Sequence, residues 1–284
     1  MPVLLVVLSM LSMVACHRPD TLTTNSGFIS PLKPADITYA ELAERYNAAI
    51  APMTTLWSRA DIEVEWFEID GDGQRKYRSE SGNGKFIMRR GSGSTLTDTA
   101  MTVEKLGKIY LWAGTNQFNY YLFDRVDGDN KKLYVGEHIG SLGGQPKAYP
   151  LPVHPRSIPR LLGLEPLEEA LFFEAEPTID LYGDQYLLNH PDQSVRMLID
   201  PKTFRPTRVD LTNAKGFSVL TAKLSGQLEV EANRALPSPP LICDKAEVYV
   251  AGYESRFTLD FQSATTSSRK VSDQMFDLEA LSKA

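Results

Sequence analysis

The spacing of apolar side chains predicts an amphipathic helix near the start of the folded part of the chain. Apolar residues recur three or four positions apart at Leu42, Tyr46, Ala49, Ile50 and Met53. Thr38 and Glu41 stand three residues apart and match a capping box at the first helical turn. Pro52 cannot continue a helix, because it lacks a backbone N–H. The pattern therefore predicts a helix over residues 39–50.

The hydrophobic period then changes from helical to strictly alternating. Ala60, Ile62, Val64 and Trp66 are separated by acidic residues, as in a strand with one buried and one solvated face. A hairpin turn follows at residues 70–73. Further strands are predicted at 75–90, 97–104, 108–113, 117–124, 178–188, 194–200, 206–212, 217–231, 246–253 and 256–262. The short connections between them suit an antiparallel meander.

The middle of the chain interrupts this strand pattern. Residues 127–156 are irregular and contain Gly and Pro throughout, and residues 157–164 are typical of a short capped helix that extends towards residue 173. We therefore predict a mainly β fold of the α+β class, with a single curved antiparallel sheet of about ten or eleven strands. Such a sheet must cover its apolar face, by closing, by pairing with a second sheet or by wrapping around helices. The N-terminal helix and the mid-chain insertion are the natural covers.

The pattern at the N-terminus predicts a targeting signal. Residues 2–15 are uncharged and mostly apolar, but this stretch is too short to span a bilayer and fits the h-region of a signal peptide. Met13-Val14-Ala15-Cys16 resembles the bacterial lipobox, which implies cleavage after residue 15 and diacylation of Cys16. The alternatives are a plain signal peptide with an incidental cysteine, or a start upstream, since Met1-Pro2-Val3 supplies no basic residue. We expect residues 1–15 to be a lipoprotein signal peptide, 16–36 a flexible tether and 37–284 one domain.

Charge and cysteine content exclude several classes of protein. The chain has 284 residues, 30 basic and 36 acidic side chains and a net charge of −6, so it lacks the basic surface of a nucleic-acid-binding protein. The chain has two cysteines, and a lipidated Cys16 leaves Cys243 to pack as a small apolar residue.

No segment has a catalytic or metal-binding signature. The acidic turn at 70–73 lacks the ligands that complete a calcium loop. The Gly-rich segments 82–85 and 91–94 match neither a phosphate loop nor a nucleophile elbow. The histidines lack zinc-ligand spacing, although two of them lie in the irregular region and can meet in space: His17, His138, His154 and His190. We therefore expect no enzyme activity, metal or cofactor.

The order of elements resembles the LolA/LolB-like family of bacterial lipoprotein carriers and receptors, which includes outer-membrane lipoprotein-sorting proteins. The residues that carry the resemblance are the helix at 39–50, the strand from Trp57 to Val64, the hairpin strand 108–112, the mid-chain helix and the segment 200–209. The resemblance covers residues 37–280. It implies a half-barrel with helices as a lid over an apolar cavity that takes up acyl chains. It also implies an interior arginine, for which Arg89 or Arg59 are candidates, and a protruding apolar loop, for which Leu106 is the candidate.

The alternating pattern indicates which side chains line the expected cavity: Ile62, Val64, Trp66, Phe86, Met88, Leu111, Phe118 and Tyr120. The same residues equally fit a filled core, in which case the chain is a structural or protein-interaction lipoprotein without a ligand. A membrane-tethered sensor domain is a third reading. His17 rather than aspartate follows Cys16, so in a cell with two membranes the resemblance implies the outer membrane. We expect a monomer whose partners are acyl chains of lipoproteins or other lipids, and the membrane itself.

Overall fold

The computed structural model describes residues 33–69, 72–91, 96–125, 131–138, 153–168, 173–232, 238–252 and 255–279. The expected signal peptide, Cys16, most of the expected tether and the turn residues Asp70 and Gly71 lie outside the described residues.

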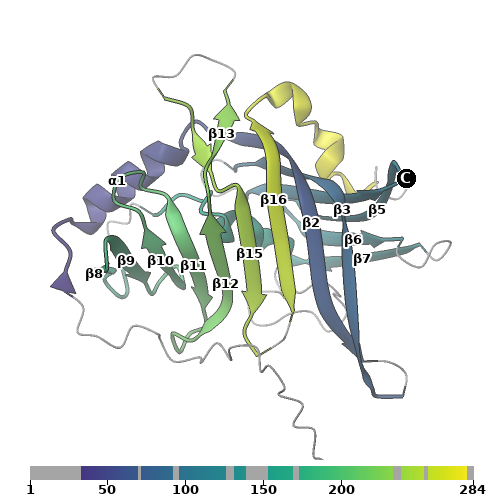
Figure 1. Cartoon of the computed structure of the whole chain (residues 1–284), viewed down its shortest axis with the longest axis horizontal. Helices are drawn as coiled ribbons and strands as arrows, with labels where there is room; N and C mark the ends of the chain where they lie inside the picture. Colours follow the sequence, from purple (N-terminus) through teal and green to yellow (C-terminus); the bar gives the residue numbers. More distant parts are fainter. Residues whose placement is uncertain are drawn as a thin grey trace, which may run out of the picture.

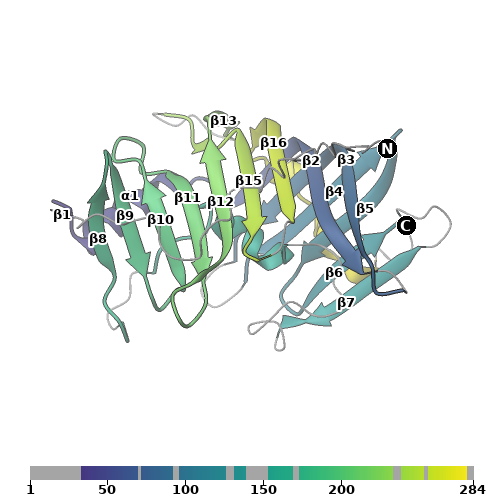
Figure 2. The ribbon, with the colours of Figure 1, turned by 60° about the horizontal axis from the view of Figure 1, so that its bottom comes forward.

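The described chain forms one open, curved sheet in which all strand pairs but one are antiparallel (Figures 1 and 2). Its 16 strands exceed the ten or eleven expected, but the predicted fold class is confirmed. The strands are β1 (Lys33–Pro34), β2 (Thr55–Ile69), β3 (Arg75–Arg89), β4 (Asp98–Lys105), β5 (Lys108–Thr115), β6 (Asn119–Asp124), β7 (Lys132–Glu137), β8 (Thr178–Tyr182), β9 (Gln185–His190), β10 (Val195–Ile199), β11 (Pro206–Thr212), β12 (Ser218–Ser225), β13 (Leu228–Glu231), β14 (Leu241–Ile242), β15 (Lys245–Val250) and β16 (Arg256–Thr265).

Two meanders make up the sheet, and β2 joins them. The strand order is β1-β8-β9-β10-β11-β12-β15-β16-β2-β3-β4-β5-β6-β7, with β13 paired parallel to β16 and β14 paired to β13. The antiparallel register of β16 and β2 places Leu259 opposite Ile62. Figure 2 shows the strands side by side from β8 to β7, with the β6–β7 edge turned out of the plane of the central strands.

Glycine in β3 allows neighbouring backbones to approach closely in the centre of the sheet. A Cβ atom at Gly84 would lie 2.0 Å from the backbone oxygen of Thr102 on β4 and 2.6 Å from Cδ1 of Ile62 on β2. Any larger residue would push β4 or the core away.

Helix α1 (Tyr39–Ile50) confirms the predicted N-terminal helix and its capping box. The backbone N–H of Thr38 donates to Oε2 of Glu41 at 2.9 Å, and the backbone N–H of Glu41 donates to Oγ1 of Thr38 at 3.3 Å. The buried face of the helix consists of Leu42, Ala43, Tyr46 and Ile50. Figure 1 shows α1 lying across the β8–β12 part of the sheet.

Several elements differ from the sequence-based expectation. The expected strand 178–188 is a hairpin of β8 and β9, because Gly183 takes a φ of +63° in the turn. The expected strand 217–231 is divided at Gly226, which has a φ of +60°. Strand β7 lies in the segment expected to be irregular, and β1 pairs with β8 inside the range expected as a tether.

The mid-chain helix is present but shorter than expected. It consists of a 3-10 turn, η2 (Pro155–Ser157), followed by α2 (Ile158–Leu161). Gly163, with a φ of +64°, follows its end, so the helix does not continue through residues 164–168. No helix among the described residues is long and apolar enough to cross a membrane.

Both faces of the β2–β6 region are covered. The inner face packs against α1, η2 and α2. The outer face packs against the C-terminal 3-10 turns η3 (Ser268–Lys270) and η4 (Asp273–Phe276), seen in yellow in Figure 1. There Phe276 packs with Ile87 and Ala100, and the hydroxyl of Tyr121 donates to the backbone oxygen of Met275 at 3.1 Å.

Candidate functional site: the apolar interior and its lid

The inner face of the sheet gathers most of the side chains predicted to line a cavity. Six of the eight are buried in one hydrophobic cluster: Ile62, Val64, Phe86, Met88, Leu111 and Tyr120. They share a face because side chains alternate along each strand. Trp66 is partly buried and packs against the same cluster. Phe118 is the exception: it lies in the β5–β6 turn with 76% of its surface exposed and lines no part of the interior.

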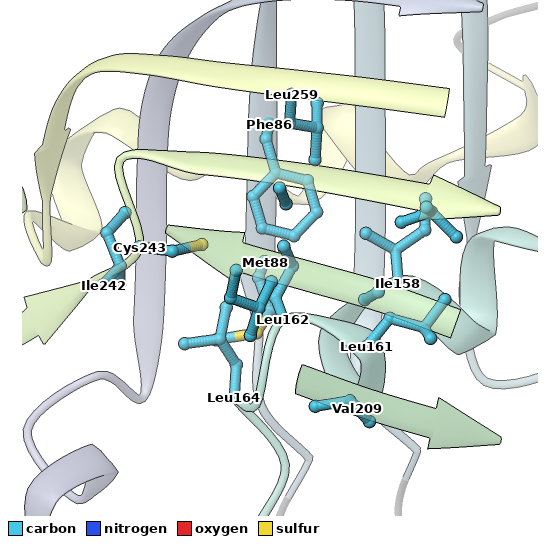
Figure 3. Close-up of a cluster of buried hydrophobic side chains, with 14 of the residues drawn as sticks. Phe86, Met88, Ile158, Leu161, Leu162, Leu164, Val209, Ile242, Cys243 and Leu259 are labelled. Atoms are coloured by element: carbon cyan, nitrogen blue, oxygen red, sulfur yellow. The ribbon is translucent and has the colours of Figure 1, made fainter. Parts of the chain in front are cut away.

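A segment from the middle of the chain fills this interior. We call residues 153–168 the lid segment; it contains η2 and α2. Figure 3 shows its apolar side chains pointing into the same cluster as Phe86 and Met88 of β3. Those buried side chains are Val153, Ile158, Leu161, Leu162, Leu164 and Leu167.

Among the described residues, the lid segment occupies the place of the expected open cavity. One pocket between the lid segment and the inner face has a volume of about 10 Å³, and its walls include Val64, Met101 and Ile158. That volume is about the smallest that holds one water molecule, so this pocket has no room for an acyl chain.

A few side chains fasten the lid segment to α1 and β3. The amide of Asn47 donates from Nδ2 to the oxygen of Leu167 at 2.9 Å, and its Oδ1 accepts from the N–H of Leu167 at 2.8 Å. The hydroxyl of Tyr39 donates to the oxygen of Glu168 at 2.8 Å. These bonds satisfy lid backbone groups that have no strand or helix partner of their own.

Arg90 makes the third fastening. Its Nη2 donates to the oxygen of Ile50 at the end of α1, at 3.2 Å, and to the oxygen of Leu164 in the lid segment, at 2.9 Å. Burial lowers the pKa of Arg90, although a guanidinium stays charged at neutral pH. One charged group therefore links the last turn of α1 to the lid.

Neither arginine that the resemblance suggested faces the lid segment, whereas their neighbour Arg90 does. Arg89 lies on the outer face, where it pairs with Asp98 at 2.7 Å and with Asp273, over the ring of Phe276. The guanidinium of Arg59 lies 5.9 Å from the centre of the Trp57 ring, and Trp57 packs on the outer face. Alternation along β3 contained the signal, because Met88 points inwards and the next inward position is residue 90.

His154 caps the lid segment's 3-10 turn in a half-buried position. Its Nδ1 accepts the backbone N–H of Arg156 at 3.2 Å, and its ring packs edge-on against Tyr120 with 4.4 Å between ring centres. Burial, with the nearby His138 and Arg156, lowers the pKa of His154 to about 4. His138 and His154 do come together, at 6.4 Å between ring centres. Among the described residues, however, no three His, Cys, Asp or Glu side chains form a metal-binding group.

Leu106 protrudes at the tip of the β4–β5 hairpin. The side chain is fully exposed, and its φ of +51° lies in the left-handed region that favours glycine or asparagine. An apolar residue is held in a strained backbone conformation where solvent reaches it from all sides.

Comparison with known proteins supports the fold. The chain matches no family model and no curated protein sequence. It is similar to the crystal structure of a DUF1329 family protein from Desulfovibrio piger, at 11% identity and a TM-score of 0.51 over 85% of this chain and 97% of that one.

Two further solved structures align over a comparable length. An outer membrane lipoprotein-sorting protein domain from Vibrio parahaemolyticus is 9% identical, with a TM-score of 0.47 over 85% of this chain and 97% of that one. A LolA superfamily protein from Nitrosomonas europaea is 12% identical, with a TM-score of 0.46 over 86% of this chain and 99% of that one. Both TM-scores are too low to establish a common fold, and the first likeness shows that this chain shares the fold of the DUF1329 family protein.

Proposed function

We propose that this chain is a cell-envelope lipoprotein, anchored through Cys16, that takes up acyl chains of lipoproteins or other lipids for transfer, without catalysing a reaction. The binding surface is the apolar inner face, exposed when the lid segment moves away. The observation that carries the proposal is the way the interior is filled: by a short, mostly irregular segment fastened through the side chains of Tyr39, Asn47 and Arg90.

The energies of lid burial and acyl-chain burial are comparable. The lid segment buries six aliphatic side chains, each at most 3% exposed. Full burial of one such side chain contributes about 1.5–3 kcal/mol, so opening the lid in water costs on the order of 10 kcal/mol. An acyl chain of about fifteen methylenes gains about 12 kcal/mol when it covers the same surface. A lid that stays closed in water therefore opens where an acyl chain replaces it.

Two further features support a carrier or receptor at a membrane. Leu106 offers an exposed apolar side chain at a hairpin tip. It is the candidate for the protruding apolar loop that the resemblance to LolA/LolB-like proteins implies. Residues 2–16 supply the apolar signal and the cysteine for lipid anchoring, and an outer-membrane address follows from His17 after Cys16.

The binding step is tested by incubating the full chain with palmitate and with a palmitoylated peptide, and by native mass spectrometry of the product. We expect a bound acyl chain and reduced amide protection in residues 153–168. The variant Asn47→Ala, which loosens the lid segment, should take up the probe faster, whereas Glu44→Ala on the exposed face of the same helix should not. If neither the wild type nor Asn47→Ala takes up the probe, the proposal is wrong.

The second candidate function is a structural or protein-interaction lipoprotein with a permanently filled core. The residual interior space of about 10 Å³ favours it. The two functions differ in the exchange of the lid segment: a permanent core keeps residues 153–168 as strongly protected as β2 and β3, with or without lipid.

The anchor is tested separately. We expect the wild-type chain in the membrane fraction and Cys16→Ala in the soluble fraction, with diacylglyceryl mass on the N-terminal peptide of the wild type only.

A further inference from the structure

A second pocket opens at the β10–β11 connection, and Leu162 of the lid segment forms part of its wall. It has a volume of about 340 Å³, within the usual size range of small-molecule sites. One part of its wall is apolar and comes from Leu224, Leu241 and Ile242. The charged part of the wall comes from Arg205, which lines the pocket and is only 8% exposed.

Arg205 is a buried cation that forms no ion pair with the described residues. Its Nη1 has no hydrogen-bond partner among the described residues. The groups that favour its charged form are the hydroxyl of Tyr46 and the thiol of Cys243. Burial raises the pKa of Tyr46 to about 12 and that of Cys243 to about 12, so both are neutral at neutral pH. An uncompensated buried guanidinium is costly, so an anion that reaches this side chain through the pocket would stabilise it.

Hydrogen bonds close the turn that carries Arg205. The backbone N–H of Phe204 donates to the oxygen of Asp200 at 2.8 Å, and the N–H of Asp200 donates to the oxygen of Arg205 at 3.0 Å. The N–H of Arg205 donates to Oγ1 of Thr203 at 3.3 Å. Phe204 has a φ of +52°, a strained value for an aromatic residue. The arginine is thus presented by a closed, strained turn and not by a free loop.

We infer that the Arg205 pocket binds an oxyanion, a carboxylate or a phosphate, carried by a molecule with a compact apolar part. The guanidinium pairs with the oxyanion, since its fork of N–H donors matches both groups. The apolar part contacts Leu224, Leu241 and Ile242. Asp200 also lines the pocket, with its Oδ1 accepting the N–H of Lys202 at 2.7 Å, and disfavours ligands with a second negative charge. The pocket is open in the present structure, so this site goes beyond the acyl-chain function and does not depend on lid opening.

The test is titration calorimetry of the full chain with three probes: octanoate, inorganic phosphate and the neutral analogue octanol. We expect octanoate to bind and octanol to bind at least about tenfold more weakly, because a charge-assisted pair is lost. Octanoate binding stronger than phosphate binding identifies an amphiphile as the ligand; equal binding identifies a free oxyanion. Equal affinity for octanoate and octanol would overturn the inference.

Matched variants locate the binding. Arg205→Met removes the charge at similar volume and should weaken octanoate and phosphate by at least about tenfold. Gln227→Trp fills the mouth from an exposed position and should do the same if Arg205→Met does not fold. Arg269→Met makes the same charge change at an exposed site in η3, outside the pocket lining, and should leave affinity unchanged. Octanoate taken up by the lid-controlled interior would respond to Asn47→Ala and not to Arg205→Met, so the two sites are distinguishable. Unchanged affinity in Arg205→Met and Gln227→Trp would overturn the inference.

Discussion

The side-chain amide of Asn47 pairs with the backbone of Leu167 through two hydrogen bonds, of 2.9 Å and 2.8 Å, across 120 residues of sequence. The amide supplies one donor and one acceptor, as the backbone of an edge β-strand does. It therefore gives the lid segment a hydrogen-bond partner that the sheet does not provide. Because both bonds come from one side chain, a single substitution removes them together.

Asn47→Ala should therefore loosen the lid segment while the sheet stays intact. Loss of two hydrogen bonds predicts a decrease of about 1–2 kcal/mol in the free energy of lid closure. Hydrogen exchange measured by mass spectrometry should be faster in residues 153–168 and unchanged in β2 and β3. Glu44→Ala serves as the control, and equal protection of the lid in both variants would contradict the prediction.

Arg90→Met should loosen the lid segment by removing the hydrogen bonds that the Arg90 side chain makes. The variant loses the bonds to Ile50 and Leu164, so we expect lid protection factors to fall by about tenfold, as the loss of charge-assisted hydrogen bonds predicts. Its neighbour provides the matched control: Arg89→Met breaks ion pairs on the outer face and should affect exchange in η3 and η4 only. A lid response to Arg89→Met equal to that of Arg90→Met would show that the effect is general destabilisation.

Acidification should weaken lid closure through His154. Burial lowers its pKa from 6.5 to about 4, so the lid-open or unfolded chain binds a proton at pH values where the closed chain does not. The stabilisation from the neutral ring is complete above about pH 6.5 and is lost as the pH falls towards 4. Lid protection factors at about pH 4.5 should thus be lower than at about pH 7.5. His154→Asn keeps an N-cap side chain without this titration, and its lid should show a smaller pH dependence.

Leu106→Asn should stabilise the fold and impair transfer. Asparagine tolerates a positive φ better than leucine does, so we expect a gain of about 0.5–1 kcal/mol in the free energy of unfolding, measured by urea titration. Transfer of a palmitoylated peptide from the chain to vesicles should slow, because the exposed apolar side chain is gone. Unchanged transfer would show that the tip has no membrane role.

The residues of α1 and the faces of the central strands were predictable because they depend on local spacing. The capping box at Thr38 and Glu41 starts the helix where expected. Alternation identified the inward positions of β2 and β3, including Ile62 and Phe86. Phe118 was assigned to the interior wrongly because the strand begins at Asn119, two residues after the predicted start at 117, which leaves Phe118 in the turn.

The functional features were harder to find because they join segments far apart in sequence. Arg90 was missed although the alternation of β3 points it inwards, because the strand pattern ends there. Arg205 lies in the segment 200–209, which contributes to the family resemblance but has no local pattern that predicts a buried arginine. The two-residue turn at Gly183 was read as part of one strand because apolar residues flank it closely.

The amino-acid sequence by itself determined the helix, the alternating strands and the mainly β class of the fold, since hydrophobic period and capping act over a few neighbouring residues. Only the tertiary structure decided that the lid segment fills the interior and that Arg205 is buried with no carboxylate partner among the described residues. Both depend on which distant side chains occupy the same volume, and packing and desolvation are properties of that volume rather than of the local sequence.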